Sequence, residues 1–533
     1  MKQRHSTVLP WLALAIVGKG GPSKVPEWDA LGRRWWSYVQ VLADDKMEGR
    51  GTGTRGYERA ASYVVEQFRA AGLKPAGVND FRQPVDFHNT QLDRAHSSID
   101  LVLDGKRHPV KIGEQAALVV NSQTPEEVDA EAVFVGYGLS VTELGYDDLS
   151  GLDLRGKVAV LLRGGPTNLP GPIKAHFQSP EERHKALRKA GAIGIIAILN
   201  PTVQDLPWPR LSSGLMTSRL ELADPGPDGF VPLPFVVMFN HEHAEALFAG
   251  SRFTFKQIVA DLGTDQALPR FPLAVKIHAR VKMVREEVKC QNLVAVLPGS
   301  DPQLKSEYVI VSAHLDHLGI GEPINGDSIY SGAMDNASGV AALIQIAQSM
   351  KDSGARPRRS ILFLVVTGEE KGLLGSEYYA NHPTVAGPIV ANLNLDGLLP
   401  LCAFKHWEIQ GLEESTLGDD VRNISRQNGV EAHTEYEPDR VLFIRSDQYS
   451  FIKKGVPALF PMYGYLQGSE DEKLFRNWVK DRYHAPSDDL DQPVNFAGAA
   501  QFNHLMEILL LRIADADSRP AWKPDSFFRR FAR

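Results

Sequence analysis

Short, uninterrupted apolar runs in the C-terminal half of the chain constrain its fold most strongly. The runs lie at residues 292–297, 308–312, 361–366, 389–395 and 456–460, and helical patterns separate them at 337–350, 446–454 and 496–514. Apolar runs without polar alternation are typical of strands that are buried on both faces. Such strands, alternating with helices, form a mostly parallel sheet that is covered by helices on both sides. The sequence therefore predicts an α/β domain of this kind.

A chain of 533 residues is longer than one hydrophobic core usually serves, so more than one domain is expected. A second α/β pattern consists of strands at 132–137 and 157–162, a helix at 180–190 and a strand at 192–199. This region contains no cluster of metal ligands and no nucleophile with a base. We therefore predict a smaller α/β domain over 126–265, inserted into a discontinuous catalytic domain formed by 30–125 and 270–520.

The flanks of this insertion have patterns of their own. Helical spacing of apolar residues predicts amphipathic helices at 35–42 and 57–71. The glycine-rich stretch 48–53 lies between them and lacks the lysine and the spacing of a phosphate-binding loop, so we interpret it as a connector. Strict alternation at 273–281 predicts a half-buried antiparallel strand.

The first residues resemble a secretory signal. Lys2 and Arg4 precede an apolar run at 8–17, which is too short to span a bilayer because a transmembrane helix needs roughly 20 apolar residues. We expect residues 1–23 to direct export to the periplasm or the medium, with cleavage or a short anchor as the alternatives. Pro10 within the run also fits an N-terminus that is merely apolar.

Composition narrows the class of partner. A formal net charge of -7 with no basic stripe argues against nucleic acid or an anionic membrane and favours small molecules or peptides. Cys290 and Cys402 are too few for a disulfide framework and have no metal-binding spacing, although a single bridge between them stays open. The sequence does not predict an oligomeric state.

Metal-ligand residue types follow the apolar runs. In an open α/β sheet the active site lies beyond the carboxyl ends of the strands, which is where these residues fall. They are His314, Asp316 and His317 after the run 308–312, Glu369 and Glu370 after the run 361–366, Asp396 after the run 389–395, Asp335 before a helix, and His484 in a late loop. Singly, each fits a cap, a turn or a solvated surface residue. Together, nitrogen and oxygen ligands without sulfur suit catalytic zinc with open positions.

These residues lie in motifs that resemble the dizinc aminopeptidase family, which also contains glutamate carboxypeptidases, glutaminyl cyclases and transferrin receptors. The motifs are HLDH from His314, GDSIYSGAMDNASG from Gly326, TGEEKGLLGS from Thr367, NLDG from Asn394 and YHAPSD from Tyr483. The middle region, with FVGYG from Phe134 and KAGAIGIIAI from Lys189, resembles the protease-associated domain that is often inserted into this fold.

The resemblance implies two Zn²⁺ ions and a role for each residue. Asp335 would bridge both ions, with His314 and Asp396 completing one site and Glu370 and His484 the other. Glu369 would be the general base, and Tyr483 would donate a hydrogen bond to the oxyanion. Asp316 would accept the second ring proton of His314. His317 is interpreted as a supporting or structural residue, because a loop does not keep helical register with His314.

The implied activity is removal of N-terminal amino acids from peptides. A carboxypeptidase on the same fold is an alternative that would need arginines at the pocket, such as Arg440 or Arg445. A glutaminyl cyclase or a binding scaffold of the transferrin receptor type are further alternatives, although the ligand set here is complete. Two positions depart from the family pattern: Met334 stands where a second Asp is frequent, and Gln448 where His is frequent.

Overall fold

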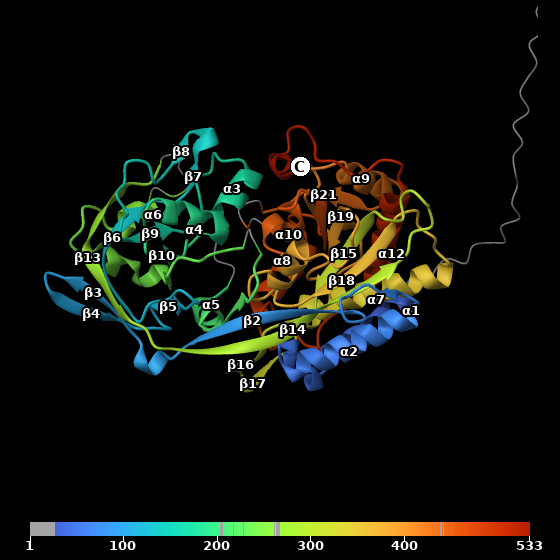
Figure 1. Ribbon diagram of the computed structural model, residues 1–533, viewed down its shortest axis with the longest axis horizontal. Helices are drawn as coiled ribbons and strands as arrows, with labels where there is room; N and C mark the ends of the chain where they lie inside the picture. The colour runs from blue at the N-terminus through green and yellow to red at the C-terminus, as the bar shows by residue number, and fades with distance from the viewer. Residues whose placement is uncertain are drawn as a thin grey trace, which may run out of the picture.

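The computed structural model describes residues 27–202, 206–216, 218–226, 229–260, 262, 267–437, 440 and 442–532. The chain forms two units side by side, each built around its own sheet (Figure 1). The predicted signal-like segment 1–23 lies outside the described residues. Among the helices of the described part, none has the length and apolar character to cross a membrane.

The central sheet of the first unit is mixed. In sheet order its strands are β11 (Arg219–Leu222), β2 (Arg82–Leu92), β14 (Met283–Leu297), β18 (Ser360–Val366), β15 (Tyr308–His314), β19 (Ile389–Asn394), β22 (Ala458–Tyr463), β20 (His406–Gln410) and β21 (Glu431–His433), with β1 (Lys74–Pro75) beside β14. The strands β18, β15, β19 and β22 are mutually parallel, and β14 and β20 flank them in antiparallel orientation. The predicted α/β class is confirmed, and the parallel part is the centre of the sheet.

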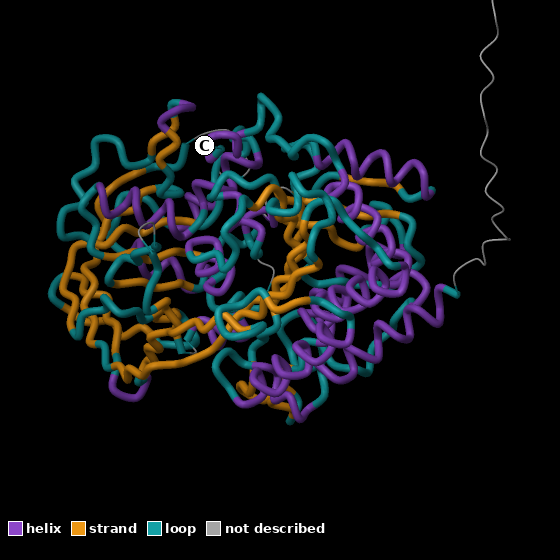
Figure 2. The backbone as a smooth tube through the Cα atoms, turned by 45° about the vertical axis from the view of Figure 1, so that its right-hand side comes forward, coloured by secondary structure: helices purple, strands orange, loops and turns teal. Residues whose placement is uncertain are grey.

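Helices cover both faces of this sheet because its strands are apolar on both. Val309 and Val311 of β15 face the core that includes α1 (Trp28–Leu42), α2 (Arg55–Ala70), α7 (Ser338–Ser353) and α12 (Phe496–Asp515). Ile310 faces the opposite core, with α8 (Leu374–Asn381) and α10 (Gln448–Ile452). Figure 2 shows helices gathered around this unit, whereas the other unit is richer in strands. The period of two along β15 therefore accounts for the three-layer arrangement.

The second unit contains a mixed sheet of its own. Its strands, in sheet order, are β4 (Lys106–Val110), β3 (Ser98–Leu103), β13 (Arg270–Arg280), β6 (Glu127–Val135), β9 (Val158–Leu162), β10 (Gly194–Ile198), β12 (Phe235–Phe239) and β5 (Ala116–Val119). Its helices are α3 (Gly171–Gln178), α4 (Pro180–Lys189), α5 (Trp208–Leu215) and α6 (Phe255–Ala260). The alternating strand predicted at 273–281 corresponds to β13, which is antiparallel to β3 and β6.

The strands that form the second unit do not coincide with the insertion predicted at 126–265. Strands β3, β4, β5 and β13 belong to the second sheet although they lie outside that range, and β11 pairs with β2 of the central sheet although it lies inside it. Long-range backbone pairing decides this, and periodicity along the chain does not reveal it. Cys290 and Cys402 do not form a disulfide.

Candidate metal centre

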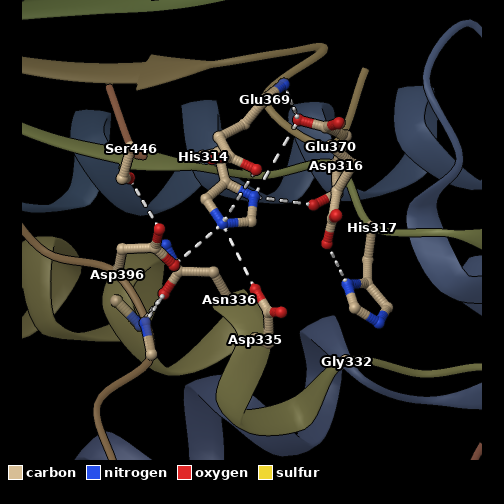
Figure 3. Close-up of polar contacts among 12 residues, drawn as sticks. His314, Asp316, His317, Gly332, Asp335, Asn336, Glu369, Glu370, Asp396 and Ser446 are labelled. Atoms are coloured by element: carbon tan, nitrogen blue, oxygen red, sulfur yellow. Dashed lines mark hydrogen bonds and ion pairs between the residues drawn. The ribbon is translucent and has the colours of Figure 1, made fainter. Parts of the chain in front are cut away.

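The predicted site residues meet at one edge of the central sheet (Figure 3). His314 is the last residue of β15, Glu369 and Glu370 follow β18, and Asp396 follows β19. These strands are parallel, so their carboxyl ends lie at the same edge. Asp335 comes from the turn that precedes α7. The remaining residues, Tyr483 and His484, lie in the loop after α11 (Glu470–Asp481).

His314, Asp335 and Asp396 form the first group of ligands. The Nε2 atom of His314 lies 3.0 Å from Oδ1 of Asp396 and 3.3 Å from Oδ1 of Asp335. The other ring nitrogen, Nδ1, donates to the main-chain oxygen of Asp316 at 2.9 Å. This bond holds Nε2 toward the two carboxylates, and with a cation bound between them it would fix the tautomer whose Nε2 lone pair is the ligand.

The second group uses the other oxygen of Asp335. Nε2 of His484 lies 3.2 Å from Oδ2 of Asp335 and 3.2 Å from Oε2 of Glu370. Nδ1 of His317 lies 2.7 Å from Oε1 of Glu370. Each carboxylate oxygen of Asp335 thus faces a different histidine, which is the geometry that a shared bridging ligand requires.

The second group offers two histidines, and they differ in their contacts. His484 contacts both Asp335 and Glu370, as the predicted ligand should. His317 contacts Glu370 through Nδ1, and its buried Nε2 has no protein partner. His317 also lies close enough to Asp335 and Glu370 for the three to surround a cation. The contact with Glu370 fits the supporting role that the sequence predicts for His317.

Burial and charge together perturb the ionisation of the site. Burial alone would lower the pKa of His314, but the carboxylates of Asp396 and Glu369 outweigh it and raise that pKa well above its ordinary value. Burial likewise opposes the charged form of His484, yet Glu370 and Asp335 raise its pKa to about 10. Several carboxylates share a buried space in which the histidines supply the positive charge, and divalent cations would compensate this crowding far better.

Glu369 stands apart from both groups. Its Oε2 lies 4.0 Å from Nε2 of His314, and its side chain is 12% exposed. Burial raises the pKa of this carboxyl well above its usual range, against the attraction of His314. Tyr483 stacks on His484 with ring centroids 4.0 Å apart, and burial raises the pKa of its phenol well above the ordinary value. Both side chains face the pocket described below.

Asp316 supports the site differently from the prediction. Its carboxylate lies 4.0 Å from Nδ1 of His314, whereas its main-chain oxygen lies 2.9 Å away and accepts the ring proton. The carboxylate instead accepts hydrogen bonds from Oγ1 of Thr52 and from the backbone nitrogen of Glu369. Asp316 therefore fixes the start of the segment that carries Glu369 and Glu370.

The glycine-rich stretch 48–53 does more than connect two helices. Arg50 is fully buried and donates to the main-chain oxygens of Leu42, Leu315, Ser331 and Gly332. Leu315 follows His314, and Gly332 precedes the turn that carries Asp335. No local motif marked Arg50, because its partners lie 8, 265, 281 and 282 residues away.

Other supporting residues also escaped the sequence analysis. Ser446 donates to Oδ2 of Asp396 at 2.6 Å, and so orients the carboxylate whose other oxygen faces His314. Asp488 is fully buried and accepts from the backbone nitrogens of Met334 and Asp335. The YHAPSD motif contains Asp488, and the short helical turn Leu442–Ile444 before Ser446 carries no comparable signal.

The two departures from the family pattern have structural explanations. Met334 is fully buried and contributes its backbone nitrogen to the bond with Asp488. Gln448 is also fully buried, accepts from Nδ2 of Asn394 at 3.0 Å, and donates to the main-chain oxygen of Phe443. Neither side chain lines the pocket.

A cavity of about 760 Å³ opens onto the metal-binding residues. Asp335, Glu369, Asp396, Tyr483 and His484 lie at one part of its wall. The rest combines charged side chains, among them Glu437, Arg440, Arg445 and Arg476, with an apolar and aromatic set that includes Leu399, Phe460, Met462, Tyr463, Tyr465, Phe475, Trp478 and Val479. Thr202 from the second unit also lines it. A cavity of this size and lining suits a side chain or a short peptide.

Known proteins resemble this chain in sequence. Residues 292–508 match the family model described as "Peptidase family M28". The "Leupeptin-inactivating enzyme 1" of Streptomyces exfoliatus is 30% identical over 170 residues, which are 31% of this chain and 34% of that protein. The "Probable glutamate carboxypeptidase VP8" of Zea mays is 26% identical over 366 residues, 64% of this chain and 47% of that protein. This chain thus spans less than half the length of either relative.

A solved structure shares the fold. The "Aminopeptidase from Aneurinibacillus sp. strain AM-1" superposes with a TM-score of 0.55 at 18% identity, covering 93% of this chain and 97% of that chain. At this identity the likeness concerns the fold, and it extends over both units.

Proposed function

We propose that the protein is a dizinc exopeptidase that removes amino acids from the N-termini of peptides, and the premise is the match of residues 292–508 to the model of peptidase family M28. One observation carries the proposal: Oδ1 of Asp335 faces His314, and Oδ2 faces His484. One carboxylate shared between two groups of nitrogen and oxygen ligands is what a pair of catalytic zinc ions requires.

The residues fit zinc in spacing as well as in type. Ligands around tetrahedral zinc lie about 2.0–2.2 Å from the ion, so they are roughly 3.4 Å from one another. The distances from His314 to Asp396 and Asp335 are 3.0 and 3.3 Å, and both distances from His484 are 3.2 Å. We therefore assign His314, Asp335 and Asp396 to one ion, and Asp335, Glu370 and His484 to the other.

Bound zinc would lower the pKa of a water molecule and polarise the scissile carbonyl. Glu369 is placed to take up a proton from that water and to deliver it to the leaving amine, because its carboxylate lies beside both groups without belonging to either. Tyr483 keeps its phenol proton, since burial raises the pKa of that group, and would donate a hydrogen bond to the carbonyl oxygen as negative charge develops there.

The pocket favours a large apolar side chain next to the scissile bond. Aromatic and aliphatic side chains form a large part of its wall, while Glu369 and Asp396 supply negative charge where a free α-amino group would lie. An acetyl cap would remove the positive charge of that group. We therefore expect free N-termini to be required.

A carboxypeptidase is the second candidate, and one observation favours it. Arg440, Arg445 and Arg476 line the same pocket, and arginine is suited to binding a carboxylate. However, Glu437 lies 3.3 Å from Arg440 and 3.2 Å from Arg476, so it offsets part of this positive charge. The aminopeptidase assignment is favoured for this reason.

The amino acids released from a panel of peptides distinguish an aminopeptidase from a carboxypeptidase. Matched peptides with free or acetylated N-termini are incubated with the enzyme, with chelator-treated enzyme before and after zinc is restored, and with Glu369→Ala. We expect release of N-terminal residues from free peptides only, dependence on zinc, and a loss of about 10²–10⁴-fold in kcat for Glu369→Ala. Glu322→Ala, an exposed carboxylate on β16 (Gly319–Ile324), is the matched control. Residues released from the C-termini of acetylated peptides would instead identify a carboxypeptidase.

We also propose that the second unit, which resembles a protease-associated domain, limits access to the site. Thr202 lines the pocket, and Arg210 of α5 donates to the main-chain oxygen of Tyr483 at 2.8 Å. Comparing long and short peptides tests this, because Thr202→Trp should slow the cleavage of long peptides more. Equal effects on both lengths would contradict it. Export directed by residues 1–23 stays a prediction, and sequencing the N-terminus of the secreted protein tests it.

A further inference from the structure

A separate group of nitrogen and oxygen ligands lies on β21, the edge strand of the central sheet, and on its neighbour β20. His406 is the first residue of β20, and Glu431 and His433 are the first and last residues of β21. The parallel register sets His406 opposite Glu431 and Glu408 opposite His433. Residues two apart on a strand point to the same face, so His406, Glu431 and His433 share one face of the sheet.

The three side chains converge on one point. Nδ1 of His406 lies 3.0 Å from Nε2 of His433 and 3.5 Å from Oε2 of Glu431. Nε2 of His433 lies 3.7 Å from the same carboxylate oxygen. These separations are close to the roughly 3.4 Å expected between ligands of one tetrahedral zinc ion. The three donor atoms therefore lie at corners that a single ion could occupy between them.

The two imidazoles are joined by a single hydrogen bond between ring nitrogens, and an ion could take the place of its proton. Their side chains are only 14% and 29% exposed, and they face each other nitrogen to nitrogen. Only one proton fits between these nitrogens, and a charge on both rings would be repulsive.

We propose that His406, Glu431 and His433 bind a Zn²⁺ ion, distinct from the pair assigned to the peptidase site. Glu431 is 70% exposed, so the fourth position faces solvent and is filled by water. Two histidines and one carboxylate are a ligand set that zinc uses widely. The proposal depends only on β20 and β21 and does not rest on the proposed peptidase activity.

The ion would stabilise one wall of the pocket. The chain leaves β21 at His433 and reaches Tyr436, whose ring centroid lies 5.5 Å from that of His433. Tyr436 lines the pocket, its backbone nitrogen donates to Glu408, and its hydroxyl donates to the main-chain oxygen of Tyr465. A zinc ion joining β20 to β21 would therefore fix the start of the segment that forms this wall.

Zinc content tests the proposal directly. Protein without a histidine tag is stripped with chelator, loaded with Zn²⁺ alone, freed of excess metal and analysed for zinc ions per chain. We expect His433→Ala and Glu431→Gln each to bind one zinc ion fewer than the wild type. His108→Ala, on the exposed strand β4, is the matched control and should keep the full zinc content. Glu431 is exposed, so Glu431→Gln should fold even if His433→Ala does not.

The outcomes separate this site from the peptidase site. Unchanged zinc content in both His433→Ala and Glu431→Gln would overturn the proposal. Asp335→Asn alters the proposed peptidase site alone. Zinc content that falls by one further ion when His433→Ala is added to Asp335→Asn supports the edge-strand site, even if the wild type binds fewer ions than the dizinc proposal requires. Equal content in the single and double variants would refute the site.

Discussion

Replacing Arg50 by methionine removes hydrogen bonds from four main-chain carbonyl groups that frame the metal centre. The guanidinium donates to Leu42, Leu315, Ser331 and Gly332 at 2.7–2.8 Å, and the side chain is fully buried. Methionine retains much of the aliphatic volume, so the substitution isolates the loss of the hydrogen bonds from the loss of packing.

The expected cost follows from these contacts. A buried acceptor that loses its partner costs about 1–3 kcal/mol, so four carbonyls at the lower limit cost about 4 kcal/mol. Burying the guanidinium is itself unfavourable, as shown by its pKa, which burial lowers to about 10. Relief of that penalty offsets part of the loss, and we expect the free energy of unfolding to fall by about 3 kcal/mol.

Urea denaturation followed by fluorescence and circular dichroism measures this change. Coincident transitions are required first, because a chain with two units need not unfold in one step. Arg50→Lys is measured beside Arg50→Met for comparison. Its ammonium group keeps the positive charge but cannot donate to four carbonyl groups as a planar guanidinium does. We expect it to lie between the wild type and Arg50→Met.

The functional effect should accompany the loss of stability. Leu315 and Gly332 adjoin the segments that carry His314 and Asp335, so Arg50→Met should also weaken zinc binding. A decrease of less than about 1 kcal/mol, with normal zinc affinity, would refute the reasoning, because it would mean that water replaces the guanidinium at no cost.

Three further predictions concern one residue that contacts a metal ligand, Ser446, and two residues of the second unit, Arg210 and His176. Ser446→Ala frees the Asp396 oxygen that the serine holds at 2.6 Å; we expect zinc affinity, measured by chelator competition, to fall about 10–100-fold, and unchanged affinity would contradict this. Arg210→Ala releases the main-chain oxygen of Tyr483; a loss of about 1.4 kcal/mol of transition-state stabilisation would lower kcat/KM about tenfold with zinc content unchanged, whereas loss of zinc would indicate wider disruption. His176 is buried in the second unit, and burial lowers its pKa to about 4. Its folded pKa lies below the unfolded value of 6.5, so its contribution is present above pH 6.5 and is lost as the pH falls toward 4. Over that range the unfolding free energy of the wild type should fall about 3 kcal/mol more than that of His176→Gln, and parallel pH profiles would disprove the assignment.

Much of the metal centre could be predicted because its residues follow a local rule. His314, Glu369, Glu370 and Asp396 each come directly after an apolar run, and parallel strands bring such positions to one edge. The prediction required only that the runs be strands and that they be parallel. His484 was less constrained by this rule, and its motif identified it.

The supporting contacts could not be predicted in the same way. Asp316 was expected to orient His314 through its carboxylate, but the main-chain oxygen does so, and the carboxylate turns to Thr52 and Glu369. Local backbone geometry decides whether the main-chain oxygen or the carboxylate of a residue accepts a hydrogen bond. The pattern of residue types in a sequence carries no information on that choice.

The sequence by itself determined the class of the fold, the parallel strands at the centre of the sheet and the residues that gather at its edge, because apolar periodicity and ligand chemistry are local properties. Only the tertiary structure decided which strands belong to which sheet, that Arg50 braces the turn before Asp335, and that His406 meets His433 across an edge pair. These features join segments that are far apart along the chain, or depend on a register that packing sets. Their physical basis is contact in space, which spacing along a sequence does not record.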